Sequence, residues 1–163
     1  MKTLLLLRHA KSSWKDSDLD DHDRPLNKRG KRDAPRMGQL LLDENLLPDL
    51  IVCSSAKRTR RTAELVSETS GYRGETRITG DVYEAWADRL LTTIQAFPAE
   101  ASRVLLIGHN PGLEELLEAV TGNYRPLSTA ALAWLEFPVD DWREINKENK
   151  AELKHVWQPR ELE

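Results

Sequence analysis

Three runs of apolar residues stand out along the chain, at residues 3–7 (TLLLL), 49–54 (DLIVCS) and 103–108 (RVLLIG). None of them alternates between apolar and polar positions, which is typical of strands that are covered on both faces of a parallel sheet. Two later segments, residues 131–137 and 152–158, do alternate. They predict strands with one face closer to water.

Apolar residues at helical spacing follow two of the three apolar runs. Residues 57–70 place an apolar stripe on one face, and residues 111–122 repeat leucine and valine at i, i+3, i+4 and i+7. The two stripes consist of Thr59, Thr62, Ala63 and Val66, and of Leu113, Leu116, Leu117 and Val120. Further helices are predicted at residues 27–43 and 87–97. Strands interleaved with helices indicate an α/β layered fold, and we expect a single domain over residues 1–163.

Local signals refine the helix ends. Asn110 is predicted to cap the helix at 111–122, with Pro111 in its first position and Gly122 at its end. Pro35 lies inside the helix predicted at 27–43. A proline there removes a backbone donor, so we expect a kink or a late start.

Composition narrows the functional classes. The 163 residues carry a formal net charge of −3, which gives the whole molecule no electrostatic reason to bind nucleic acid or an anionic membrane. The single cysteine, Cys53, excludes an internal disulfide framework and a cysteine-based zinc cluster, and we expect a buried thiol. The first apolar run is too short for a signal peptide, and no segment has the roughly 20 apolar residues of a membrane helix. We therefore expect a cytoplasmic protein.

Polar residues follow each of the three buried strands. The first strand ends in Arg8-His9, the second runs through Ser54-Ser55 into Lys57-Arg58, and the third ends in His109-Asn110. Ligands of α/β sheets bind at the carboxyl ends of the strands, and helix N-termini there favour anions. If the three strands are neighbours, these residues form a phosphate pocket.

The residue types suit phosphoryl transfer. Arginine matches phosphoryl oxygens in bidentate fashion, a neutral imidazole can attack phosphorus, and a second imidazole can donate a hydrogen bond to the oxygens. Protein cations could then do this work without a metal or another cofactor.

Four motifs at these positions resemble those of the histidine phosphatase, or phosphoglycerate mutase-like, superfamily, and in particular its SixA-type phosphohistidine phosphatases. The four motifs are LLRHAKS, DRPLNKRG, SSAKRTRRTAE and LLIGHNPG. In the first, Ala10 replaces the usual glycine. In the third, Ser55 and Thr59 replace proline and alanine. The resemblance covers residues 1 to about 117. It implies a three-layer α/β/α fold with a central, mostly parallel sheet.

The resemblance also implies roles. His9 would be the phosphorylated nucleophile, and Arg8, Arg58 and His109 would complete the phosphate pocket. The motif selects Arg58, which helical spacing alone does not separate from Arg60. Further candidates for substrate binding are Arg24, Lys11, Ser12 and Asn110.

The sequence leaves the identity of the general acid open. The segment DVYEAWADRLL offers Glu84, with Asp81 and Asp88 nearby, and the alternative is that Glu84 is a surface carboxylate. An alkoxide leaving group needs a proton donor, whereas the imidazole of a phosphohistidine departs after easy protonation. The expected substrate is therefore a phosphohistidine on a protein partner, such as a histidine phosphotransfer domain. A small phosphate ester is the alternative.

Other interpretations concern the remaining motifs. A metal-dependent hydrolase could use His9, His22 and His109 with aspartates, and a phosphate- or nucleic-acid-binding module could form around residues 57–61. We expect His22 to be structural or exposed, and residues 16–23 to form a solvated acidic loop near the pocket mouth. Trp14 and Trp86 could line the rim, but core packing is the default expectation.

Overall fold

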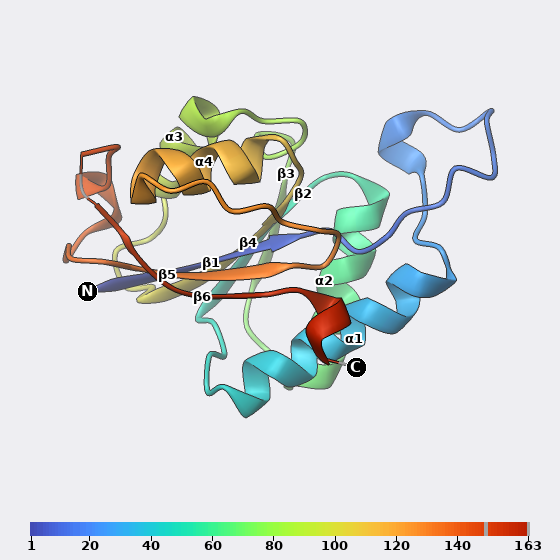
Figure 1. The fold of residues 1–163 in the computed structure, drawn as a ribbon, viewed down its shortest axis with the longest axis horizontal. Coiled ribbons are helices and arrows are strands. Elements are labelled where there is room, and N and C mark those ends of the chain that lie inside the picture. Colours follow the sequence, from blue (N-terminus) through green and yellow to red (C-terminus); the bar gives the residue numbers. More distant parts are fainter. Residues whose placement is uncertain (149, 163) are drawn as a thin grey trace.

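A six-stranded sheet runs through the centre of the protein, in the order β3-β2-β4-β1-β5-β6 (Figure 1). The computed structural model describes residues 1–148 and 150–162, so residues 149 and 163 of the expected domain lie outside the described part. β3, β2, β4 and β1 are parallel, β5 is antiparallel to β1, and β6 is antiparallel to β5. The strands are β1 (Lys2–Arg8), β2 (Leu50–Ser54), β3 (Thr76–Thr79), β4 (Arg103–Gly108), β5 (Leu132–Phe137) and β6 (Glu152–Trp157).

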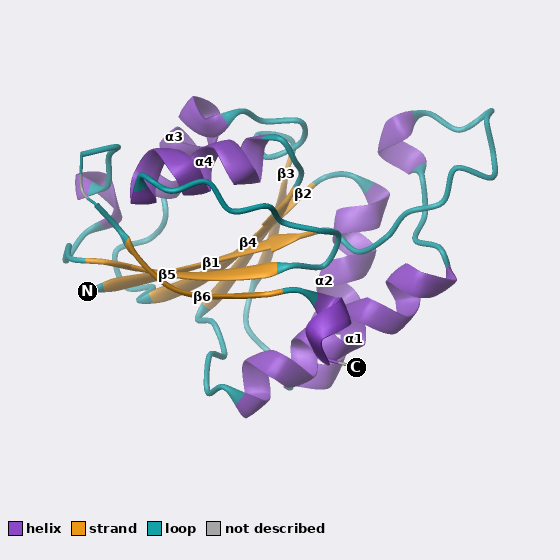
Figure 2. Ribbon diagram, in the orientation of Figure 1, coloured by secondary structure: helices purple, strands orange, loops and turns teal. Residues whose placement is uncertain are grey.

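Helices cover both faces of the sheet (Figure 2). One face carries α1 (Lys28–Asp43) and α2 (Lys57–Ser70), and the other carries α3 (Ala87–Gln95) and α4 (Gly112–Thr121). Short 3₁₀ helices lie in the connections, at η1 (Asp21–Asp23), η2 (Trp142–Glu144) and η3 (Pro159–Leu162). The predicted three-layer α/β/α architecture with a mostly parallel sheet is confirmed. Within the described residues, no helix combines the length and the apolar character that crossing a membrane requires.

The leucine run of β1 is buried because its side chains enter two separate cores. Leu4 and Leu6 pack in the core beneath α3 and α4, whereas Leu5 and Leu7 pack in the core beneath α1 and α2. All four side chains are 0% exposed. Since successive side chains of a strand point to opposite faces, a strand with a core on each side must be apolar at every position.

The structure departs from the sequence-based expectations in three places: one unexpected strand and the starts of two helices. β3 was not expected, since its sequence TRIT is polar and the strand lies exposed at the sheet edge. α1 begins at Lys28, so the late start at Pro35 is wrong; the Asn27 side chain caps this helix by accepting from the Gly30 N–H at 2.9 Å. The Asn110 cap is also wrong.

Asn110 has another partner. α4 begins only at Gly112, and the Asn110 Nδ2 donates instead to the Leu127 carbonyl at 2.8 Å. The acceptor of this side chain, Oδ1, is buried without a partner among the described residues, so it does not cap the first N–H groups of α4. The helix ends at Gly122 as predicted, because this residue has a left-handed φ of 81°.

The first turn of α1 lies against the segment that follows β1. A Cβ added to Gly30 would lie 2.2 Å from the Lys11 carbonyl oxygen, which explains why DRPLNKRG ends in glycine. The same carbonyl accepts from the Asn27 N–H at 3.0 Å. Gly30 therefore lets α1 approach the loop that carries His9.

We predict that Gly30→Ala lowers the free energy of unfolding by about 2 kcal/mol, because an overlap with backbone must be relieved by shifting α1. Gly80→Ala is the matched control: the nearest atom to its added Cβ, the Ser55 Oγ, lies 3.9 Å away, and Gly80 is exposed. Urea-induced unfolding of both variants measures the difference. Equal stability of the two variants would contradict this account of Gly30.

Candidate active site

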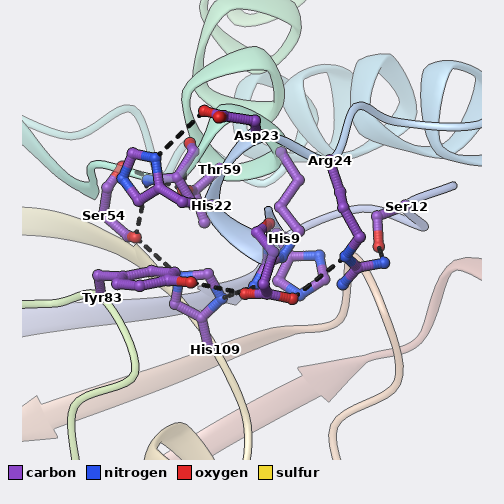
Figure 3. Close-up of polar contacts among 12 residues, drawn as sticks. His9, Ser12, His22, Asp23, Arg24, Ser54, Thr59, Tyr83 and His109 are labelled. Atoms are coloured by element: carbon purple, nitrogen blue, oxygen red, sulfur yellow. Dashed lines mark hydrogen bonds and ion pairs between the residues drawn. The ribbon is translucent and has the colours of Figure 1, made fainter. Parts of the chain in front are cut away.

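The carboxyl ends of β1, β4 and β2 meet at one edge of the sheet. β4 lies between β1 and β2 and is parallel to both, so the expectation that the three buried strands are neighbours is confirmed. His9 follows β1, Ser54 ends β2 and His109 follows β4. The ring centroids of the two histidines are 5.2 Å apart (Figure 3). The topology thus brings together the groups that a phosphate pocket requires.

His9 is buried and held by a backbone contact. Its side chain is 6% exposed, and its Nδ1 lies 2.8 Å from the Ala10 carbonyl oxygen. A carbonyl can only accept, so Nδ1 carries the proton and Nε2 keeps its lone pair. Burial, with His109 and Arg58 nearby, lowers the pKa of His9 to about 3. His9 is therefore a neutral imidazole with a nucleophilic nitrogen at physiological pH.

His109 contacts β2 and α2. Its Nε2 lies 2.7 Å from the Ser54 Oγ, and the Arg58 Nη2 lies 3.4 Å from its Nδ1. Burial first, and then the charge of Arg58, lower the pKa of His109 to about 4. Both histidines are thus uncharged at physiological pH.

The structure separates the two arginines that helical spacing left unresolved. Arg58, in the first turn of α2, is 4% exposed and reaches the histidines. Arg60 is exposed, and its Nε donates to the Ser55 carbonyl at 3.0 Å. Only Arg58 belongs to the pocket.

Arg8 and Asn110 are anchored to the same carbonyl. The Arg8 Nη1 donates to the Leu127 oxygen at 3.0 Å, as does the Asn110 Nδ2 at 2.8 Å. The Nε groups of Arg8 and Arg58 are buried without a partner among the described residues. Buried donors usually have acceptors, so these two unpaired N–H groups are consistent with a site that binds an anion.

Of the other predicted binding residues, the structure brings in Arg24 and Ser12 but not Lys11. Arg24 is 6% exposed, donates to the Ser12 Oγ at 3.0 Å, and lies 3.4 Å from the ring centroid of Trp14. The Lys11 side chain forms no hydrogen bond or ion pair with another described residue. It is the Lys11 backbone that contributes, through its contact with α1.

Glu84 lies on the rim. It is exposed, with a left-handed φ of 52°, and it borders a cavity of about 290 Å³ that is also lined by Trp86, His109 and Asn110. Trp86 is 59% exposed and Trp14 is 72% exposed, so the expectation of core packing is wrong for both. The two indoles lie beside polar site residues, where no apolar layer covers them.

Three residues that were not expected in the phosphate pocket lie at the site. Tyr83 lies edge-on to both His109 and His22, with ring centroids 5.5 Å and 4.9 Å away (Figure 3). His22, expected to be structural or exposed, is half-buried and contacts the Ser55 Oγ at 2.9 Å. Asp21 was assigned to a solvated loop, but its carboxylate bonds Arg24, Arg58 and Tyr83. The i,i+3 spacing of Asp21 and Arg24 was the one available signal.

The geometry does not favour the two alternative interpretations, a metal-dependent hydrolase and a binding module around residues 57–61. Within residues 1–148 and 150–162, no group of three or more histidine, cysteine or acidic side chains is placed to hold a metal ion. In the basic run of residues 57–61, Arg58 is buried in the pocket, while Lys57 and Arg60 are exposed. The run therefore does not form one continuous binding surface.

Sequence comparison gives a family match. The profile of the histidine phosphatase superfamily (branch 1) matches residues 4–103. An uncharacterized chloroplastic protein of Arabidopsis thaliana is 34% identical over 152 residues, which are 88% of this chain and 70% of the relative. An uncharacterized protein of Mycobacterium leprae is 31% identical over 96% of this chain and 93% of its own.

Solved structures are similar over nearly the whole chain. A Nakamurella multipartitia protein provisionally named phosphohistidine phosphatase SixA is 31% identical, with a TM-score of 0.82 over 97% of this chain and 96% of its own. An Agrobacterium tumefaciens protein with the same provisional name is 29% identical, with a TM-score of 0.83 over 97% and 98%. The protein histidine phosphatase SixA complexed with tungstate, at 18% identity and a TM-score of 0.84 over 99% of both chains, shares the fold.

The lowered pKa values of His9 and His109 predict acid sensitivity. An unfolded histidine titrates near pH 6.5, so the unfolded chain takes up protons before the folded one, and stability is lost as the pH falls from about 6.5 towards 4. Each histidine contributes a slope of up to about 1.4 kcal/mol per pH unit in this window. Urea-induced unfolding at pH 7, 6 and 5 measures it. His9→Ala should flatten the slope, whereas a variant of the exposed His155, His155→Ala, should keep it.

Proposed function

The chain belongs to the histidine phosphatase superfamily, and we propose that this phosphatase transfers the phosphoryl group of its substrate first to His9 and then to water. One observation carries the proposal. His9 is neutral, and its Nδ1 is held by the Ala10 carbonyl, so its Nε2 lone pair is available beside Arg58 and His109. Nucleophile and cations thus lie within one pocket.

In the first step, the Nε2 lone pair of His9 forms a bond to phosphorus as the bond to the leaving group breaks. The leaving group departs with the electron pair and takes up a proton. In the second step, water bonds to phosphorus, the P–N bond of phosphorylated His9 breaks, and inorganic phosphate leaves. Arg8, Arg58 and His109 stabilise the charge on the equatorial oxygens in both steps, with Arg24 and Asn110 as further binding groups.

The substrate that we propose is a phosphohistidine on a protein partner, such as a histidine phosphotransfer domain. The exposed rim around Trp14, Trp86 and Glu84 supports this choice, because a phosphorylated side chain on a protein surface needs an accessible mouth. The names of the two relatives at 31% and 29% identity point in the same direction.

His9→Ala should lower the turnover of a phosphohistidine-bearing protein and of p-nitrophenyl phosphate by at least about 1,000-fold, since it removes the imidazole that forms the covalent intermediate. The assay contains a chelator, and phosphate release is followed. His155→Ala, which replaces an exposed histidine of β6, is the matched control and should retain full activity. Turnover that survives in His9→Ala would rule out the covalent route.

A small phosphate ester is the second candidate, and Glu84 is the observation that favours it. Asp81 pairs with Arg89 at 3.2 Å and Asp88 pairs with Lys147 at 2.6 Å, whereas Glu84 forms no ion pair or hydrogen bond with another described residue. An exposed, unpaired carboxyl group that borders the His109 cavity supports the proposal that Glu84 delivers the proton that an ester leaving group needs.

Glu84→Gln separates the two substrates. With a simple alkyl phosphate the variant should be about 100-fold slower, because the alkoxide then departs without its proton donor. With a phosphohistidine protein it should stay within about 3-fold of the wild type, because imidazole departs without that help. Asp88→Asn, which removes an exposed carboxylate in the first turn of α3, is the control. An equal loss on both substrates would show that Glu84 does not act on the leaving group.

A further inference from the structure

The carboxylate of Asp21 bridges two arginines of the pocket, Arg58 and Arg24. The Oδ2 of Asp21 accepts from the Arg58 Nη2 at 3.0 Å and from the Tyr83 hydroxyl at 2.6 Å, and its Oδ1 accepts from the Arg24 Nε at 3.1 Å. The backbone oxygen of Asp21 takes the remaining Arg58 Nη1, at 2.6 Å. A single residue thus engages both Nη groups of the buried Arg58. In Figure 3, Tyr83 and Arg24 flank His9 from either side.

These donors are the ones that a bound phosphoryl group would need. The Arg58 Nη2 that bonds Asp21 also lies 3.4 Å from the His109 Nδ1, and the His109 ring is 5.2 Å from that of His9. A phosphoryl group on His9 therefore has its oxygens beside the position that the Asp21 carboxylate occupies. Carboxylate and phosphoryl oxygens both accept hydrogen bonds from guanidinium N–H groups, so the two anions compete for the same donors.

Asp21 is held by charge and hydrogen bonds rather than by packing. Burial opposes ionisation, but the hydrogen bonds from Tyr83 and Arg58 bring the pKa of Asp21 down to about 2, so it is an anion at physiological pH. η1, which carries it, has no buried residue, and residues 14–20 before it are exposed. A segment with so few buried contacts can move at small cost when a stronger anion takes the arginines.

We propose that Asp21 is an internal anion that neutralises the empty pocket and that the phosphoryl group of the substrate must displace it. Asp21 then determines specificity: a dianionic phosphoryl group attracts Arg58 and Arg24 more strongly than one carboxylate does, whereas a singly charged ligand gains little from the exchange. This inference rests on the proposed function for the identity of the ligand. It gives the acidic loop of residues 16–23 a role at the site itself.

Inorganic phosphate is the probe. Asp21→Asn keeps the shape of the side chain and removes its charge, and should lower the Kd of phosphate, measured by calorimetry at pH 7, by at least about 10-fold. Phosphate should also inhibit the variant more strongly as a product, with a matching fall in its Ki. Asp18→Asn removes the same charge from an exposed residue of the same loop and should change both constants by less than about 2-fold.

A second variant, Asp21→Ala, should also bind phosphate more tightly. Thermal unfolding of both variants checks that they are folded. Unchanged or weaker phosphate binding in both folded variants would overturn the inference, since Asp21 would then hold the arginines ready for the ligand. An equal gain in Asp18→Asn would also overturn it, by showing a general charge effect. Failure of the proposed function is distinguishable, because the wild type would then hydrolyse neither phosphoprotein nor ester.

Discussion

The site depends on one buried cation, Arg58. A guanidinium removed from water must be hydrogen-bonded and neutralised, and the first turn of α2 places it where only groups from other segments can do so. Asp21 supplies a carboxylate and a backbone carbonyl, and His109 lies within 3.4 Å. Loop, sheet and helix are therefore tied together at this side chain.

The same cation explains the protonation state of the histidines. Its charge adds to burial in lowering the pKa values of His9 and His109, so both rings stay neutral. A nucleophile needs its lone pair, and a protonated His9 would not have one. In the proposed mechanism, the positive charge that would bind the phosphoryl group would therefore also help to keep the His9 nitrogen unprotonated.

The sheet beneath the site is rigid because its central strands are buried on both faces. β1 and β4 send alternate side chains into two cores, and each core is closed by its own pair of helices. Strand ends held in this way have little freedom, which fixes the spacing of His9 and His109. The residues that complete the pocket, Asp21, Arg24 and Tyr83, come from segments that connect these elements.

Much of this arrangement could be predicted because it rests on local periodicity and on motifs. The apolar runs predicted β1, β2 and β4 as strands buried on both faces. Residues 8–9 and 109 followed from their positions at strand ends, whereas Arg58 was selected by its motif. The exposed strand β3 could not be found in this way, since the polar sequence TRIT belongs to a sheet edge where one side needs no apolar cover. Asn110 was misassigned because its true partner, Leu127, lies 17 residues away.

By itself, then, the sequence determined the layered fold and the identity of the histidines and of the arginines beside them, since these depend on neighbours along the chain. Tertiary structure alone decided that Lys11 stays outside the pocket and that Tyr83 and Asp21, 62 residues apart, share a hydrogen bond. The physical reason is that a charged side chain takes its role from the partners and the burial it meets, and folding brings those partners from distant segments.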